Sequence, residues 1–172
     1  MRRSPLWHYK SKYEKSDLSL LSFNMSALFT KRLSKELVDL KINPPAGIEV
    51  TEADTFKCWK LTLDGVDGTL YAGERFTLEF RFSPNYPMES PEVVFTGNIP
   101  IHPHIYSNGH ICLNVLYNQW SPVLSVRSVC LSIQSMLSSC TCKEPPPDNN
   151  HYVKTAKASP KQTQWSFHDD TV

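Results

Sequence analysis

Apolar residues recur at helical spacing in two stretches of the chain. The first stripe, with intervals of four, four and three, consists of Phe29, Leu33, Leu37 and Leu40. It predicts a helix that begins near Ser26 and ends before Pro44-Pro45, since proline cannot continue a helical hydrogen-bond ladder. The second stripe consists of Val126, Val129, Ile133, Met136 and Leu137. Ser125 stands directly before it, at the position of a helix N-cap.

Alternation of apolar and polar residues lies between these two stretches. It is clearest over residues 75–82, where the apolar face consists of Phe76, Leu78, Phe80 and Phe82. Residues 58–63 alternate in the same way, residues 93–95 form a short apolar run, and residues 48–50 are a candidate edge strand. Such half-buried alternation is typical of antiparallel sheets. The order of helix, strands, irregular loop and helix predicts a single α+β domain.

Composition divides the 172 residues into three parts. Residues 1–25 carry five Lys or Arg against two acidic residues and show no clear periodicity, which predicts a disordered basic extension. Residues 26–150 hold the periodic segments and are the expected folded core. Residues 151–172 are polar, with Tyr152, Trp165 and Phe167 as isolated anchors, and predict a partly flexible tail.

Charge and cysteine content exclude several classes of function. The net charge of +1 gives no reason to expect a nucleic-acid or membrane partner, and no run of 18 apolar residues is present. The five cysteines are odd in number and follow no secretory signal, so we expect free thiols in the reducing nucleus or cytoplasm. There is no Cys-x-x-Cys pair, and Cys140 and Cys142 lie too close for a standard structural zinc pair.

One cysteine lies in a segment without helical or strand periodicity. His102-Pro103-His104 and Asn108-Gly109 precede Cys112, and both are turn-forming sequences. A thiol presented on a loop is a candidate nucleophile. From the residues alone three other interpretations stay open: a zinc site built from His102, His104, His110 and Cys112; a cysteine hydrolase in which His104 or His110 activates the thiol; and a buried thiol with surface histidines.

The motifs around Cys112 follow one another in an order that resembles the ubiquitin-conjugating enzymes. His102-Pro103, then residues 108–113 (NGHICL), then Trp120-Ser121-Pro122 carry the likeness, together with the upstream motifs at residues 68–73 (GTLYAG) and 86–91 (YPMESP). The resemblance runs from about residue 26 to the C-terminus, and it implies that residues 26–150 are the catalytic core. The tail, residues 151–172, diverges from the family and is expected to be partly disordered or to lie near the active-site cleft. The resemblance implies an N-terminal helix, a four-stranded antiparallel meander sheet, an active-site loop, a central helix and a divergent tail.

The resemblance also implies the chemistry. Cys112 accepts the C-terminal glycine of ubiquitin as a thioester from the ubiquitin-activating enzyme, which consumes the ATP, and the ubiquitin then passes to a substrate amine. No bound cofactor and no metal are implied. RING-type or U-box-type ubiquitin ligases are the further partners, and the expected location is the nucleus and cytoplasm. An inactive binding module with the same fold is the alternative, against which the retained thiol argues.

A departure at His104 points to one branch of the family. Most members have asparagine there, whereas His-Pro-His and the tail residues 165–171 (WSFHDDT) resemble the W-type enzymes, which modify the α-amino group of flexible substrate N-termini. An α-amine has a pKa of about 7.7–8.0 and a lysine of about 10.4, so the unprotonated fraction near neutral pH is roughly a few hundred-fold higher for the α-amine. Such an enzyme needs less help with deprotonation.

Carried over residue by residue, the resemblance implies further site residues. His104 supports the oxyanion, acts as a base or only holds the loop, and His102 orders the loop. Asp148 loosely matches the acidic residue of the family, although Asn149 could fill that place. The implied ligase contacts are Lys31, Arg32, Met88, Ser121, Pro122 and Val123. The alternatives are an ordinary solvated helix face for the two basic residues and a small core contact for the methionine.

Overall fold

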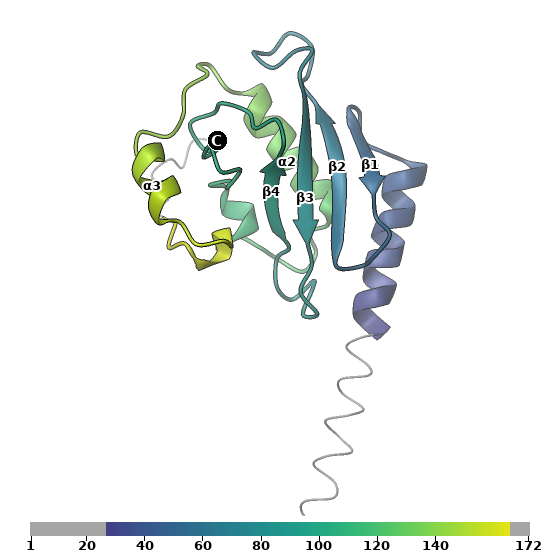
Figure 1. The fold of residues 1–172 in the computed structure, drawn as a ribbon. Helices are drawn as coiled ribbons and strands as arrows, with labels where there is room; N and C mark the ends of the chain where they lie inside the picture. The colour runs from purple at the N-terminus through teal and green to yellow at the C-terminus, as the bar shows by residue number, and fades with distance from the viewer. Residues whose placement is uncertain (1–26, 166–172) are drawn as a thin grey trace, which may run out of the picture.

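The computed structural model describes residues 27–165, so the predictions for residues 1–25 and for the tail residues 166–171 lie outside the described part. The N-terminal helix is described over residues 27–42 and stands beside β1 (Ile48–Glu52) (Figure 1). Its apolar stripe faces inward as predicted: Leu33 and Leu40 are buried, and Phe29 and Leu37 pack against the core. The helix ends before Pro44-Pro45.

Four antiparallel strands form one meander sheet in the order β1-β2-β3-β4. Besides β1 they are β2 (Cys58–Asp64), β3 (Arg75–Arg81) and β4 (Glu92–Thr96). Cross-strand partners such as Leu61 with Leu78 and Phe80 with Val93 stand on the buried face. Burial alternates along β2 and β3, because successive side chains point to opposite faces of a sheet. All four predicted strands are therefore confirmed.

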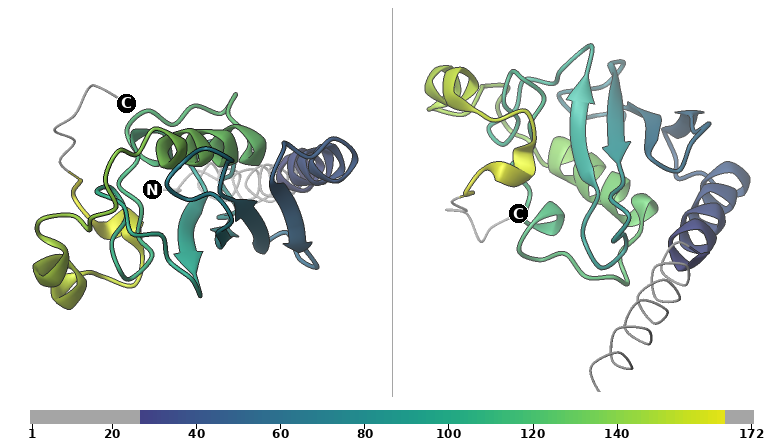
Figure 2. Two further views of the ribbon diagram at one scale, coloured as in Figure 1. Left: turned by 90° about the horizontal axis from the view of Figure 1, so that it is seen from above. Right: turned by 60° about the horizontal axis from the view of Figure 1, so that its bottom comes forward.

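Helix α2 (Val126–Ser138) covers the apolar face of the sheet (Figure 2). Its buried residues include the whole predicted stripe, with Cys130 in addition. Ser125 is the N-cap, and its side chain accepts a hydrogen bond from the backbone N–H of Ser128, whose own side chain reaches back to the Ser125 backbone. The predicted α+β fold, with the core between sheet and helices, is confirmed.

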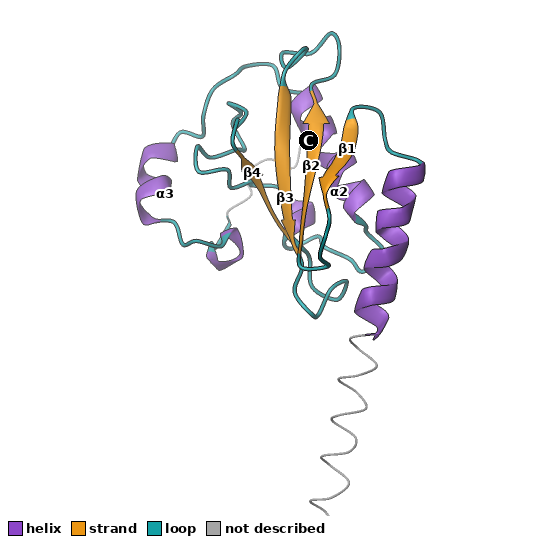
Figure 3. Ribbon diagram, turned by 45° about the vertical axis from the view of Figure 1, so that its right-hand side comes forward, coloured by secondary structure: helices purple, strands orange, loops and turns teal. Residues whose placement is uncertain are grey.

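The C-terminal part forms two short helices beside β4, on the side away from the N-terminal helix (Figure 1). They are α3 (Asn149–Thr155) and η2 (Pro160–Gln162), joined by a loop (Figure 3), and another short helix, η1 (Asn114–Leu116), precedes α2. The sequence did not predict α3, since only Tyr152 of its seven residues is buried and no apolar stripe marks it. The boundaries proposed at residues 26 and 150 stay a prediction.

Within residues 27–165, no helix combines the length and the apolar character that a membrane-spanning segment requires.

Candidate active site

The active-site loop, residues 102–112, follows β4 and is fixed by its own backbone. The N–H of Gly109 donates to the carbonyl of Tyr106 at 2.8 Å, which closes the turn predicted at Asn108-Gly109. Gly109 has a φ of +87°, and a Cβ atom there would lie 2.1 Å from the carbonyl oxygen of Phe95. Only glycine fits this left-handed position against β4. The turn thereby seats the loop on the edge of the sheet.

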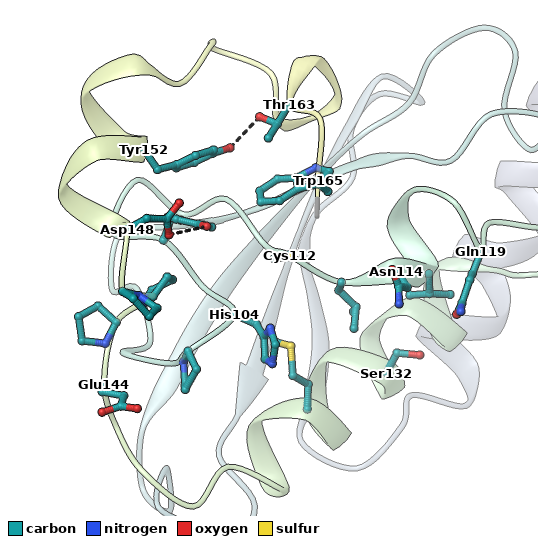
Figure 4. A pocket seen from close by; sticks show the side chains of 18 of the residues that line it. His104, Cys112, Asn114, Gln119, Ser132, Glu144, Asp148, Tyr152, Thr163 and Trp165 are labelled. Carbon is teal, nitrogen blue, oxygen red and sulfur yellow. Dashed lines mark hydrogen bonds between the residues drawn. The ribbon is translucent and has the colours of Figure 1, made fainter. Parts of the chain in front are cut away.

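Backbone pairing also places the thiol-bearing residue next to His104. The N–H of Cys112 donates to the carbonyl of His104 at 2.8 Å. Both residues are half-buried and line a cavity of about 1170 Å³, whose walls also include Asp148, Tyr152 and Trp165 (Figure 4). The loop, the segment before α3 and the C-terminal segment therefore meet at one cavity.

Burial, and secondarily the negative charge of Asp148, raises the pKa of the Cys112 thiol to about 11. Burial penalises a thiolate because it removes water from around the charge. The free enzyme therefore holds a neutral thiol near neutral pH. A nucleophilic thiolate does not stand ready in the resting protein, so a reaction at this sulfur requires removal of the thiol proton.

His102 lies beneath the loop as a neutral structural ring. It is only 3% exposed, its Nδ1 accepts the backbone N–H of His104 at 2.9 Å, and its Nε2 lies 3.2 Å from the carbonyl oxygen of Met136. A ring protonated at Nε2 satisfies both contacts. Burial, and then the proximity of His104, lowers the pKa of His102 to about 4. These contacts support the predicted loop-ordering role.

Acid should destabilise the fold through His102. The native pKa of about 4 lies below the ordinary 6.5, so between these values the unfolded chain binds a proton that the native protein excludes. We expect the free energy of unfolding to fall by about 3 kcal/mol as the pH drops through this window. Urea denaturation at several pH values measures it, with His102→Gln as the test and His151→Gln, an exposed histidine, as the control. An unchanged acid sensitivity in His102→Gln would contradict the assignment.

The segment from Asp148 to Thr163 is fastened to the active-site loop by side-chain hydrogen bonds. Tyr106 donates its hydroxyl to Asp148 Oδ1 at 3.0 Å, and the N–H of Ser107 donates to Asn149 Oδ1 at 2.9 Å. Tyr152 Oη lies 2.9 Å from His110 Nδ1 and 2.8 Å from Thr163 Oγ1. Asp148, rather than Asn149, lines the cavity. The predicted proximity of the tail to the cleft holds for the described residues.

Four aromatic rings pack together on one side of the site, and three of them, Tyr106, Tyr152 and Trp165, line the cavity. No spacing in the sequence marks them as a group. The ring centroids of Tyr106 and Tyr152 are 3.9 Å apart, and Trp165 lies 5.1 Å from Tyr117 and 5.5 Å from Tyr152. Such ring pairs contribute about 0.5–1.5 kcal/mol beyond their buried area. The sequence predicts Tyr152 and Trp165 as isolated anchors, whereas their rings contact each other in the structure.

Comparison with known proteins decides the family of this chain. The pattern described as "Ubiquitin-conjugating enzyme" matches residues 32–168. The chain belongs to the ubiquitin-conjugating enzyme family. It is 57% identical over 149 residues to "Probable ubiquitin-conjugating enzyme E2 W" of Dictyostelium discoideum, an alignment that covers 86% of this chain and 100% of that relative. It is 55% identical to "Ubiquitin-conjugating enzyme E2 W" of Caenorhabditis elegans, over 86% of this chain and 100% of that relative.

Solved structures of conjugating enzymes share the fold. The ubiquitin-conjugating enzyme UbcA1 of Agrocybe aegerita is 47% identical, with a TM-score of 0.74 over 76% of this chain and 96% of that protein. A conjugating enzyme of Plasmodium falciparum is 39% identical, with a TM-score of 0.62 over 67% and 86% of the two chains. The present conjugating enzyme is therefore a transferase that acts through a cysteine thioester, and ubiquitin, an activating enzyme and a ligase are its partners.

The geometry of this conjugating enzyme argues against the other interpretations of the loop. His102 and His110 are buried, so the interpretation of a buried thiol with surface histidines is wrong for these two residues. Their ring nitrogens bond Met136 and Tyr152, and no histidine of the described residues is hydrogen-bonded to the Cys112 thiol as a hydrolase base would be. Across residues 27–165, no three His, Cys, Asp or Glu side chains gather as a metal site.

The residues predicted to contact a ligase differ in exposure. Met88 and Val123 are 71% and 84% exposed, so a core contact for the methionine is wrong. Lys31 is exposed as well. Arg32 is only 28% exposed, and its guanidinium binds the chain's own carboxylate and carbonyl groups. It is therefore less available to a partner than the sequence suggested.

Proposed function

We propose that Cys112 carries ubiquitin as a thioester and that this conjugating enzyme passes it to the α-amino group of substrate N-termini. The observation that carries the proposal is the cavity that Cys112, His104 and Asp148 all line. It combines a thiol, an imidazole and a carboxylate around one space large enough for a peptide end. The four-ring aromatic side and the Gly109 turn hold these groups in place.

Charging is an exchange between two thioesters. The Cys112 sulfur attacks the carbonyl carbon of ubiquitin's terminal glycine, the sulfur of the activating enzyme leaves, and the thiol proton is lost to solvent or to that departing sulfur. Because the pKa of Cys112 is about 11, the proton must be removed as the attack occurs. The same high pKa makes Cys112 a slower leaving group, so the charged enzyme is expected to hold ubiquitin until a suitable amine arrives.

Transfer requires an unprotonated amine, correct orientation and support for the oxyanion. The amine nitrogen attacks the thioester carbonyl, an oxyanion forms, the Cys112 sulfur leaves and the amine loses a proton. A neutral His104 ring can donate one hydrogen bond to the oxyanion or accept the amine proton. Asp148 has one carboxylate oxygen held by Tyr106, which fixes the group for accepting a hydrogen bond from the incoming amine.

Three features support the α-amine as the preferred acceptor. Histidine stands at the position where most of the family has asparagine, relatives from Dictyostelium discoideum and Caenorhabditis elegans are named E2 W, and the α-amine needs little help with deprotonation. A flexible N-terminus would enter the cavity more readily than a lysine on a folded surface. We further propose that RING or U-box ligases dock at Met88 and Val123, and that the enzyme works in the nucleus and cytoplasm.

The thioester is tested by charging. Wild-type enzyme incubated with ubiquitin, activating enzyme and ATP should give one adduct that dithiothreitol removes. The control omits ATP, which the activating enzyme needs. A wild-type chain that forms no such adduct would sink the assignment of Cys112, whatever its behaviour with ligases.

A further inference from the structure

The proposed ligase-docking surface is assembled from three separate segments of the chain. We define it as Lys31, Arg32, Met88, Ser121, Pro122 and Val123. The first two lie on the N-terminal helix, Met88 lies in the loop of residues 82–91 after β3, and the others lie in the loop of residues 117–125 before α2. Neither loop has regular secondary structure, so something outside the loops must fix their tips relative to the helix.

The carboxylate of Glu36 touches all three segments. Its Oε1 accepts the hydroxyl of Tyr86 at 2.7 Å, two residues before Met88, and its Oε2 accepts the backbone N–H of Val126 at 2.8 Å, where the second loop enters α2. Its Oε1 also accepts a hydrogen bond from Arg32 Nε on the same helix. Glu36 is only 8% exposed, which is unusual for a glutamate unless it is paired.

Arg32 extends the same network instead of facing a partner. Its Nη1 donates to the carbonyl of Pro122 at 2.9 Å and its Nη2 to the carbonyl of Leu124 at 2.5 Å. The two loops are also bonded to each other, because the indole N–H of Trp120 donates to the carbonyl of Pro87 at 2.8 Å. Glu36 and Arg32 therefore supply hydrogen bonds from the helix to the loops and their α2 boundary, and Trp120 supplies one between the two loops.

We propose that Glu36 is a positioning residue for ligase docking: its buried carboxylate holds the two loops of the docking surface in register with the N-terminal helix. The inference rests on the proposed docking of a ligase at this surface. Without the carboxylate, the buried Tyr86 hydroxyl, the Val126 N–H and the Arg32 guanidinium each lose a charged acceptor. Hydrogen bonds to charged groups are the stronger ones, so the loops lose their shared anchor.

The network assigns different roles to two neighbouring cations. Lys31 is exposed and is left to attract a partner by charge, whereas Arg32 acts through Glu36 and the loop carbonyls. Removal of Arg32 and of Glu36 should therefore be strongly non-additive, because both changes break one unit. Removal of Lys31 and of Glu36 should be additive.

The test measures the rate of ubiquitin discharge from the charged full chain at increasing concentrations of an isolated RING or U-box domain. A panel of such domains is used. For domains that stimulate wild type, Glu36→Gln should raise the concentration that gives half-maximal stimulation by about tenfold, as expected for loss of a charged hydrogen-bond anchor. The rate at saturating domain and the ligase-free rate should stay unchanged. Tyr86→Phe, which keeps the ring, should show a smaller shift in the same direction.

Asp39→Asn is the matched control. Asp39 lies one turn further along the same helix and pairs with Arg127 without touching either loop, so its loss should leave the half-saturating concentration unchanged. Amide hydrogen exchange gives an independent readout: Glu36→Gln should accelerate exchange at Val126 and in both loops but not in β2 or β3. A lower saturated rate with an unchanged half-saturating concentration, or no panel domain that stimulates wild type, would overturn the proposal. Failure to form the thioester would be detected separately, in the charging step that precedes discharge.

Discussion

Replacing Cys112 with alanine is expected to abolish the ubiquitin adduct, and replacing it with serine should leave either no adduct or an ester that dithiothreitol cannot cleave. Transfer to any amine should fall by at least about a thousand-fold, as for loss of other covalent nucleophiles. The reason is that no other thiol of the described residues faces the cavity of His104 and Asp148. A serine hydroxyl is a far weaker nucleophile, and its ester is a far poorer acyl donor to amines.

The other cysteines provide matched controls for this result. Cys142 is exposed and Cys58 is half-buried on the sheet, so both are accessible thiols away from the cavity. Cys142→Ser and Cys58→Ser should charge and discharge like wild type. A dithiothreitol-sensitive adduct that persists in Cys112→Ala, or that disappears in Cys142→Ser, would contradict the assignment.

Alkylation of Cys112 in the free enzyme should be slow and strongly dependent on pH. The pKa of about 11 leaves far less thiolate near pH 8 than a free cysteine with a pKa of about 8.5, although the more basic thiolate is intrinsically more reactive. We therefore expect iodoacetamide to label Cys112 roughly tenfold to a hundredfold more slowly than glutathione, with the rate rising about tenfold per pH unit up to pH 10. Peptide mass spectrometry resolves Cys112 from the other cysteines.

The pH dependence of Cys112 alkylation should change when the charge of Asp148 is removed. Its carboxylate is the second cause of the raised thiol pKa, after burial. Asp148→Asn removes the charge with little change in shape and should move the midpoint of the Cys112 profile to lower pH. A wild-type rate that already levels off near pH 8.5 would contradict the neutral resting thiol. So would a midpoint that does not move in Asp148→Asn.

The regular elements could be predicted from the sequence because burial imposes a period on it. Leu33 and Leu40 at helical spacing, and Phe76, Leu78 and Phe80 at strand spacing, repeat as the two kinds of backbone require. The helix start at Ser125 was also readable, since a capping serine needs only its local neighbours. Within the site, Cys112 was found because the motif around it is contiguous.

The remaining features depend on partners distant in the sequence. Glu36 binds residues 50 and 90 positions away, and Tyr106 and His110 meet their partners 42 positions later. No periodicity marks such pairs, so the sequence predicts Arg32 as a ligase contact or part of a solvated helix face, although its guanidinium is engaged within the fold. Helix α3 was missed for the same reason. Side-chain bonds from Tyr152 and Asn149 to the active-site loop hold it there, and its own sequence has little helical pattern.

His104 is the residue whose replacement tests whether the enzyme itself selects the acceptor amine. If the imidazole selects the amine, His104→Asn should gain reactivity toward lysine while it keeps reactivity toward α-amines. An unchanged rate with both amines would assign selection to the chemistry of the amines alone and would leave His104 with a role in holding the loop.

Discharge of the charged enzyme onto two matched peptides tests the central claim most directly. One peptide has a free α-amine and no lysine, and the other is acetylated at its N-terminus and carries a single lysine in the same flexible sequence. Single-turnover loss of the dithiothreitol-sensitive adduct near neutral pH gives both rates. We expect faster discharge onto the α-amine by roughly a few hundred-fold, in line with the difference in unprotonated amine. Equal rates on the two peptides would contradict that claim.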